Sequence, residues 1–192
     1  MNTRRELLLG MGALGVAALG LHAGGRARAG DRRLANVLLQ THTGKTVRFY
    51  DDLVRDKVVA INMMYVACSG ICPTATANLR QVHRLLGERV GRRVFFYSLS
   101  LQPELDSPEV LAEYVRQQRI GPGWLFLTGA PEEVEQLRYS LGFYDPDPLL
   151  DADKNNHTGM LRIGNDRYRR WTMAPALASP RQILGTIEHV DA

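Results

Sequence analysis

The chain has 192 residues, of which 45% are hydrophobic, and this composition suits one globular domain with a hydrophobic core. Its formal net charge is +4, but residues 1–29 carry four arginines against one glutamate, so the rest of the chain is close to neutral. The main support for a nucleic-acid-binding function, a basic net charge, is therefore missing from the rest of the chain. The two arginine clusters, Arg92-Arg93 and Arg167-Tyr168-Arg169-Arg170, are interpreted as solvated strand ends.

The first 29 residues have the layout of an export signal. The pair Arg4-Arg5 precedes an apolar run from Leu7 to Leu21, and Ala27-Arg28-Ala29 forms a small-x-small cleavage site. Paired arginines are typical of the twin-arginine type of signal, which predicts export to the periplasm. We therefore expect a signal peptide at 1–29 and a single mature domain at 30–192. An uncleaved anchor is the alternative, although the run is shorter than the roughly 20 residues of a membrane-spanning helix.

The mature sequence alternates between strand patterns and helix patterns. Apolar and β-branched runs predict strands at 37–40, 46–50, 58–66, 94–100, 124–127, 157–163 and 167–173. Helical spacing of apolar residues, with a proline in the first turn, predicts helices at 73–86, 108–118, 131–141 and 180–189. The first two strands are expected to form a hairpin, and the last two a second hairpin that turns at 164–166. A polar loop is expected from 145 to 156. This order predicts an α/β fold with a mainly parallel sheet covered on both faces.

The two cysteines lie in the segment Cys68-Ser69-Gly70-Ile71-Cys72-Pro73, between a predicted strand and a predicted helix. Because Pro73 suits the first turn of a helix, both cysteines are expected in the strand-to-helix turn. Free N–H groups and the positive end of the helix dipole favour thiolates there, and a thiolate attacks disulfides or binds soft metals. A structural disulfide is the alternative in an oxidising compartment. It would close so short a loop that it would restrain little of the unfolded chain.

Among the five histidines, His157 is the strongest candidate for a metal ligand. The others lie in the predicted signal, at a hairpin turn, three helical turns beyond Cys72 and near the C-terminus: His22, His42, His83 and His189. A histidine placed like His157 is, by itself, more often a surface or capping residue. Joined to two thiolates it would suit copper, since thiolates favour Cu(I) and imidazole helps to hold Cu(II). Zinc with an open water position would fit the same three ligands.

Several motifs then follow one another in a recognisable order. They are the Cys-x-x-x-Cys-Pro turn, the segment 98–109 that contains Pro103-x-x-Asp106-Ser107-Pro108, Leu127-Thr128-Gly129, and His157 before a hairpin. Together they resemble the SCO/SenC family across almost all of the mature chain. Two positions depart from the family pattern, since Gln102 and Asn156 stand where aspartate is usual.

The resemblance implies a thioredoxin-like fold and one copper ion per chain, bound by Cys68, Cys72 and His157. It implies a metallochaperone that delivers copper to the binuclear copper centre of cytochrome c oxidase, or that reduces the cysteines of that centre. The implied partners are a copper-accepting subunit of cytochrome c oxidase or another copper protein, and thiol-disulfide reductants. We also expect a periplasmic location, with possible membrane contact through the N-terminus.

Other functions are also compatible with the sequence. A thiol-disulfide oxidoreductase with incidental copper binding is the main alternative, because thioredoxins place Cys-x-x-Cys at the same turn and need no histidine. The additional residue between Cys68 and Cys72, and the presence of His157, argue against it. A peroxidase of related fold would need a Thr-x-x-Cys turn that the chain does not contain. A binding module with a structural disulfide is the remaining class.

Overall fold

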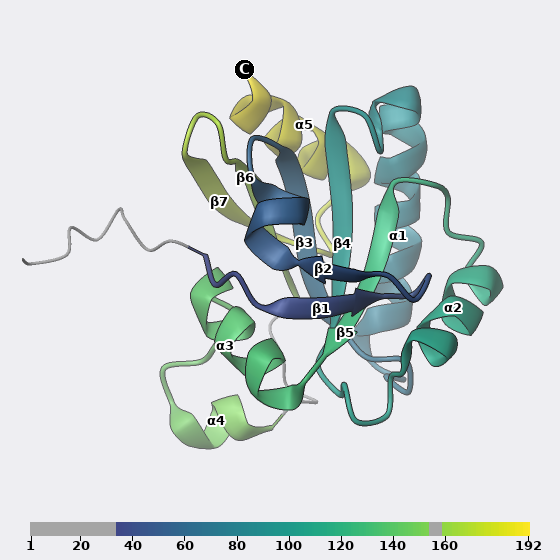
Figure 1. Cartoon of the computed structure of the whole chain (residues 1–192). Helices are drawn as coiled ribbons and strands as arrows, with labels where there is room; N and C mark the ends of the chain where they lie inside the picture. The colour runs from purple at the N-terminus through teal and green to yellow at the C-terminus, as the bar shows by residue number, and fades with distance from the viewer. Residues whose placement is uncertain (1–33, 154–158) are drawn as a thin grey trace, which may run out of the picture. The chain divides into compact units, whose positions relative to one another are not determined.

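A seven-stranded mixed sheet forms the centre of the fold in the computed structural model, which describes residues 34–153 and 159–192 (Figure 1). The strands follow the spatial order β2-β1-β5-β4-β3-β6-β7. Their bounds are β1 Leu38–Thr41, β2 Thr46–Arg48, β3 Val58–Met64, β4 Val94–Ser100, β5 Trp124–Gly129, β6 Met160–Asn165 and β7 Arg170–Pro175. All seven residues of β3 are buried, as expected for a central strand with both faces covered.

Among the described strands, parallel pairing is confined to β3, β4 and β5. The strand β1 pairs antiparallel with β2 and β5, and β6 pairs antiparallel with β3 and β7. The predicted α/β fold is therefore confirmed, whereas the prediction of a mainly parallel sheet is wrong. The reason is that a hairpin joins its strands antiparallel, and the two predicted hairpins extend the two edges of the sheet.

Helices cover both faces of this sheet. They are α1 Ile71–Leu86, α2 Pro108–Gln117, α3 Pro131–Leu141, α4 Pro148–Ala152 and α5 Pro180–Asp191, with a π-helical turn η1 at Phe49–Val54 and a 3₁₀ turn η2 at Gly87–Arg89. Successive side chains of a strand point to opposite faces, so neighbours on β4 identify what covers each side. The Phe96 ring lies 6.1 Å from the His83 ring of α1, whereas the Tyr97 hydroxyl donates a 2.8 Å hydrogen bond to the Leu53 carbonyl of η1. The helices α1 and α5 therefore pack side by side on one face, opposite η1 (Figure 1).

The polar loop predicted at 145–156 contains the short helix α4. Asp147 accepts a 2.9 Å hydrogen bond from the Leu149 N–H, and Pro148 occupies the first helical position. The residue types that indicate a loop are thus the same ones that begin a helix. This helix lies directly before the part of the chain that holds His157.

The late hairpin turns two residues later than predicted. β6 and β7 stay paired as far as Asn165 and Arg170, so the turn comprises residues 166–169 rather than 164–166. Gly164 belongs to the strand because the Trp171 ring packs against it, and a Cβ at Gly164 would lie 2.2 Å from that ring. A glycine inside a strand often marks such a close approach rather than a turn.

In the part of the chain that the structure describes, no helix combines the length and the apolar character needed to cross a membrane. The predicted signal peptide at 1–29 lies outside the described residues. The predicted start of the mature domain at residue 30 also lies outside them. Export therefore stays a prediction from the sequence.

Candidate metal centre

Cys68 lies in the turn between β3 and α1, whereas Cys72 is the second residue of α1 itself. The prediction that both cysteines lie in the turn is right for Cys68 and wrong for Cys72, because α1 begins at Ile71, two residues before Pro73. Gly70 is the N-cap residue of α1 and has no side chain to cap the first N–H groups of the helix. Both cysteines are free thiols, with exposed fractions of 9% for Cys68 and 3% for Cys72.

The two thiols lie in hydrogen-bonding contact, but their pKa values shift in opposite directions. Burial raises the pKa of Cys68, but hydrogen bonds from the Cys72 side chain, the Cys72 and Gly70 backbone and the Tyr65 hydroxyl outweigh burial and lower it. Burial, followed by the hydrogen bond to Cys68, raises the pKa of Cys72 to about 12. Cys68 is therefore the thiol of the pair that loses its proton more readily, and Cys72 is its hydrogen-bond donor.

This asymmetry corrects the prediction that the start of the helix favours a thiolate at both positions. The prediction is confirmed for Cys68, whose sulfur accepts hydrogen bonds from backbone N–H groups at the start of α1. It is wrong for Cys72, because the cost of burying a charge exceeds the benefit of the helix N-terminus. The sequence shows the spacing of the two cysteines but not the difference in their burial.

The buried carboxylate of Asp106 ties the cysteine turn to the segment that follows β4. It accepts a hydrogen bond of 3.2 Å from the Val66 backbone N–H and one of 2.5 Å from the Ser100 hydroxyl. Burial raises the pKa of Asp106 above its ordinary value, although both hydrogen bonds oppose this shift. Because Val66 precedes Cys68 by two residues, Asp106 fixes the path of the chain into the turn. The sequence places Asp106 in a motif but indicates no role for it.

Gln102, one of the two departures from the family pattern, takes part in this anchor through its backbone. Its carbonyl accepts hydrogen bonds of 2.9 Å from the N–H groups of Leu105 and Asp106, and its own N–H donates to the Ser100 hydroxyl at 3.0 Å. Since these contacts do not use the side chain, glutamine is compatible with the turn that positions Asp106. The other departure, Asn156, lies outside the described residues.

The chain returns to the cysteine turn at Gly159, just before β6. A Cβ at Gly159 would lie 2.2 Å from Cδ1 of Ile71, which stands between the two cysteines in the sequence. The Gly159 carbonyl also accepts a 2.8 Å hydrogen bond from the Ala176 N–H, just after β7. A side chain at position 159 would therefore force the terminal methyl group of Ile71 to move. Nothing in the sequence signalled this contact.

The predicted third ligand, His157, lies outside the described residues. Within 34–153 and 159–192, no group of three or more histidine, cysteine, aspartate or glutamate side chains is arranged to hold a metal ion. Cys68 and Cys72 nevertheless supply two adjoining sulfur donors, one of which favours the thiolate, and such a pair suits a soft ion such as Cu(I).

Two of the remaining histidines have structural contacts elsewhere. The Nδ1 atom of His42 accepts a 3.2 Å hydrogen bond from the Phe126 N–H, next to the β1–β2 turn. The Nε2 atom of His83 lies 2.9 Å from the Pro122 carbonyl, and its ring stacks against Trp124. The prediction that His83 does not serve the cysteines agrees with these contacts.

This combination of a dithiol at a strand-to-helix junction and a sheet with helices on both faces defines a thioredoxin-like protein. The particular family follows from comparison with known proteins. The SCO1/SenC family model matches residues 33–191, so the chain belongs to the SCO1/SenC family.

Similar solved structures share this fold. ScoI from Bradyrhizobium japonicum, solved with copper bound, has a TM-score of 0.64 and 22% identity, and the match covers 80% of this chain and 96% of that one. BsSco, described as a Sco-family cytochrome c oxidase assembly protein with a disulfide switch, has a TM-score of 0.65 and 19% identity over 81% of this chain and 91% of its own. A relative from Stutzerimonas stutzeri, described as copper-binding, is 27% identical over 101 residues. This match spans 52% of the chain and 48% of the relative's length.

The anchor at Asp106 generates a first prediction. Asp106→Ala should lower the free energy of unfolding by about 2–4 kcal/mol, because it leaves the part-buried Val66 N–H and the buried Ser100 hydroxyl without their acceptor. Urea unfolding measures this change. Glu104→Ala, an exposed acid in the same segment, is the control and should change the free energy by less than about 0.5 kcal/mol. Equal effects of the two substitutions would contradict the anchoring role.

The unequal thiols generate a second prediction. Iodoacetamide added in limiting amount to the reduced, metal-free protein at neutral pH should modify Cys68 before Cys72, because the thiolate is the reacting form. Peptide mass spectrometry measures the order of modification. In urea the two cysteines should react at similar rates, since both shifts depend on the folded structure. Faster labelling of Cys72 in the folded protein would refute the assignment.

The close approach at Gly159 generates a third prediction. Gly159→Ala should destabilise the protein through the overlap with Cδ1 of Ile71, and Ile71→Val removes that atom. The double mutant should therefore be about 1 kcal/mol more stable than the sum of the single effects. Gly185→Ala on α5, where a Cβ meets nothing within 4 Å, should raise stability and serves as the control. Strict additivity at 71 and 159 would show that the two sites do not interact.

Proposed function

We propose that this protein is a copper metallochaperone that holds copper through Cys68, Cys72 and His157 and delivers it to the copper centre of a respiratory cytochrome c oxidase. The observation that carries the proposal is the contact between a thiolate-favouring Cys68 and a protonated Cys72 at the start of α1. Membership of the SCO1/SenC family and the copper-bound state of ScoI support it. The export signal predicted at 1–29 supports a periplasmic site of action.

The role of His157 is supported by connectivity of the chain. His157 precedes Gly159 by two residues, and Gly159 lies against Ile71, between the two cysteines in sequence. Two residues of fully extended chain span at most about 7 Å. A histidine at position 157 is therefore a feasible third ligand for a metal ion held by the two sulfurs.

The proposed cycle has a reduced state and an oxidised state. In the reduced state Cys68 and Cys72 both bind copper as thiolates, so Cys72 releases the proton that it shares with Cys68. Delivery then proceeds by ligand exchange, in which thiolates of the recipient replace these two sulfurs one at a time. In the oxidised state the cysteines form a disulfide, which lacks the thiolates that hold copper.

A second candidate function is favoured by the inequality of the two thiols. Reduction of a partner's disulfide needs one attacking thiolate and one resolving thiol. Cys68 would attack a partner sulfur and form a mixed disulfide, which releases the first partner thiolate. Cys72 would then lose its proton and attack Cys68, which frees the second partner thiol and leaves a Cys68–Cys72 disulfide. Two electrons pass from this chain to the partner.

Copper binding by the reduced protein tests the proposal. We expect one copper ion per chain by elemental analysis, no binding by Cys68→Ser/Cys72→Ser, and weaker binding by His157→Ala in competition with a chromophoric Cu(I) chelator. Loss of a ligand should lower the copper affinity by more than the roughly tenfold decrease that follows loss of a side chain that only hydrogen-bonds a ligand. His189→Ala, which removes an exposed histidine of α5, should bind copper like the unmodified protein.

Turnover of a small disulfide substrate is measured on the same samples. Rapid turnover of this substrate without copper binding would contradict the metallochaperone function and support the oxidoreductase function. Unchanged copper affinity in His157→Ala would remove His157 from the proposed site.

A further inference from the structure

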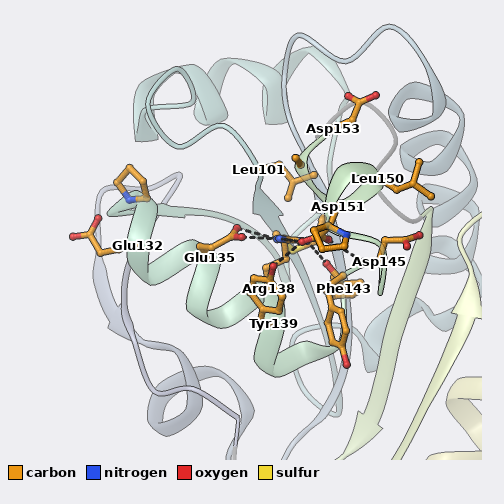
Figure 2. A pocket seen from close by; sticks show the side chains of 15 residues that line it. Leu101, Glu132, Glu135, Arg138, Tyr139, Phe143, Asp145, Leu150, Asp151 and Asp153 are labelled. Atoms are coloured by element: carbon orange, nitrogen blue, oxygen red, sulfur yellow. Dashed lines mark hydrogen bonds and ion pairs between the residues drawn. The ribbon is translucent and has the colours of Figure 1, made fainter.

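A groove of about 540 Å³ lies beside α3, and Figure 2 shows the side chains that line it. Because Met63 of β3 is part of this lining, the groove lies at the same end of the sheet as the cysteine turn. It is enclosed by α3 and by residues 144–153, and its buried floor is formed by Met63, Leu101 and Phe143. Met63 belongs to β3, five residues before Cys68, and Leu101 directly follows β4. The carboxyl ends of parallel strands are a common position for binding sites in α/β folds.

One rim of the groove reaches the neighbourhood of the thiols. Asp153 lines the groove. The Asp153 carboxylate also interacts electrostatically with Tyr65. The Tyr65 hydroxyl is one of the groups that hydrogen-bond Cys68. A molecule bound in the groove would therefore lie beside the candidate metal centre.

An ion-pair network centred on the buried Arg138 side chain holds the walls of the groove together. The Arg138 guanidinium donates two hydrogen bonds of 2.6 and 2.7 Å to Asp151, two of 2.9 and 2.6 Å to Glu135, and one of 2.8 Å to the Phe143 carbonyl (Figure 2). The Tyr139 hydroxyl donates a further bond of 2.7 Å to Asp151. These bonds join α3 to α4, so the groove is formed before any ligand arrives. They also engage every nitrogen of the guanidinium, so Arg138 is not available to an incoming anion.

Apolar side chains at the mouth of the groove are exposed to solvent. The rings of Tyr139 and Tyr144 lie with their centroids 5.3 Å apart, and both are exposed. Leu150 is 48% exposed, and its neighbour Leu149 is more exposed still. An exposed apolar patch with a polar rim marks an interaction site, and tyrosine is enriched in protein interfaces.

The charge of the groove restricts what it can bind. Its described lining contains one cation, Arg138, and five carboxylates: Glu132, Glu135, Asp145, Asp151 and Asp153. The groove is therefore strongly negative, which repels anionic ligands and membrane surfaces and attracts cations. An apolar floor beneath an acidic rim is complementary to an apolar side chain flanked by lysine or arginine.

We propose that this groove docks a cationic segment of a partner protein, in which lysine or arginine flanks an apolar or aromatic anchor. The anchor occupies the floor at Met63 and Leu101, and the cations lie along the carboxylate rim. The inference rests on the proposed function in one respect, since the partner is taken to be the protein that exchanges copper or electrons with Cys68 and Cys72. Docking in the groove brings the sulfurs of that partner to the cysteine turn.

An amidated hexapeptide with the order lysine, leucine, arginine, phenylalanine, lysine, leucine serves as the probe. Titrated into the isotope-labelled, reduced protein, it should shift the amide NMR signals of residues that line the groove. Leu150→Ser should weaken its binding about tenfold by removing apolar contact area. Glu132→Lys should weaken it about fivefold at low salt, and less at high salt because ions screen the rim.

Matched substitutions outside the groove are the controls. Leu85→Ser on α1 removes a leucine that is 50% exposed, and Glu88→Lys in η2 reverses an exposed carboxylate. Both should leave peptide binding unchanged. A peptide in which glutamate replaces each cation should not bind.

The inference is overturned if the peptide does not bind, if its signals map elsewhere, if the acidic peptide binds equally well, or if the groove variants bind like the controls. It is also overturned if the protein self-associates in sedimentation and Leu150→Ser abolishes that association, because the occupant is then a second copy. Copper bound per chain is measured on the same samples. Copper binding without groove recognition refutes only the docking inference, and groove recognition without copper binding refutes only the proposed function.

Discussion

The uncapped N-terminus of α1 is the feature on which the chemistry of the site depends. A helix begins with N–H groups that have no partner within the helix, and Gly70 supplies no side chain to satisfy them. The Cys68 sulfur accepts hydrogen bonds from this backbone and from the Cys72 thiol, and these bonds outweigh the cost of its burial. Cys72 lies within the helix and remains protonated. Two chemically identical side chains therefore differ because Cys72 is the more deeply buried and donates the hydrogen bond that Cys68 accepts.

This arrangement is held by contacts from distant parts of the chain. Asp106 fixes Val66, near the start of the turn, from a position 40 residues away in the sequence. Gly159 packs against Ile71, the first residue of α1, and its carbonyl accepts a hydrogen bond from the Ala176 N–H. The turn is thus fixed on both sides, so the Cys68 sulfur stays aligned with the helix N–H groups. Burying the Asp106 carboxylate is unfavourable, as its raised pKa indicates, and its two hydrogen bonds offset part of that cost.

The sequence predicted those features that depend on local patterns. The buried strand β3, the helix after Pro73 and both edge hairpins follow from the spacing of apolar residues and from turn residues. Strand direction was predicted less well, because apolar periodicity identifies a strand without identifying its neighbour. The different protonation of Cys68 and Cys72 and the role of Asp106 depend on burial and on long-range contacts, which spacing does not encode. His157 and the signal at 1–29 lie outside the described residues and stay predictions.

The burial of the two sulfurs also explains how one site can serve either proposed reaction. A partner sulfur that approaches the turn meets Cys68 first, because Cys72 is less exposed and lies inside α1. Copper transfer by ligand exchange and disulfide reduction by thiolate attack both begin with contact between a partner sulfur and this part of the site. What separates them is whether the two thiolates already hold a metal ion when the partner arrives. The oxidation and metal-loading state of the pair, rather than a change of fold, would then decide which reaction follows.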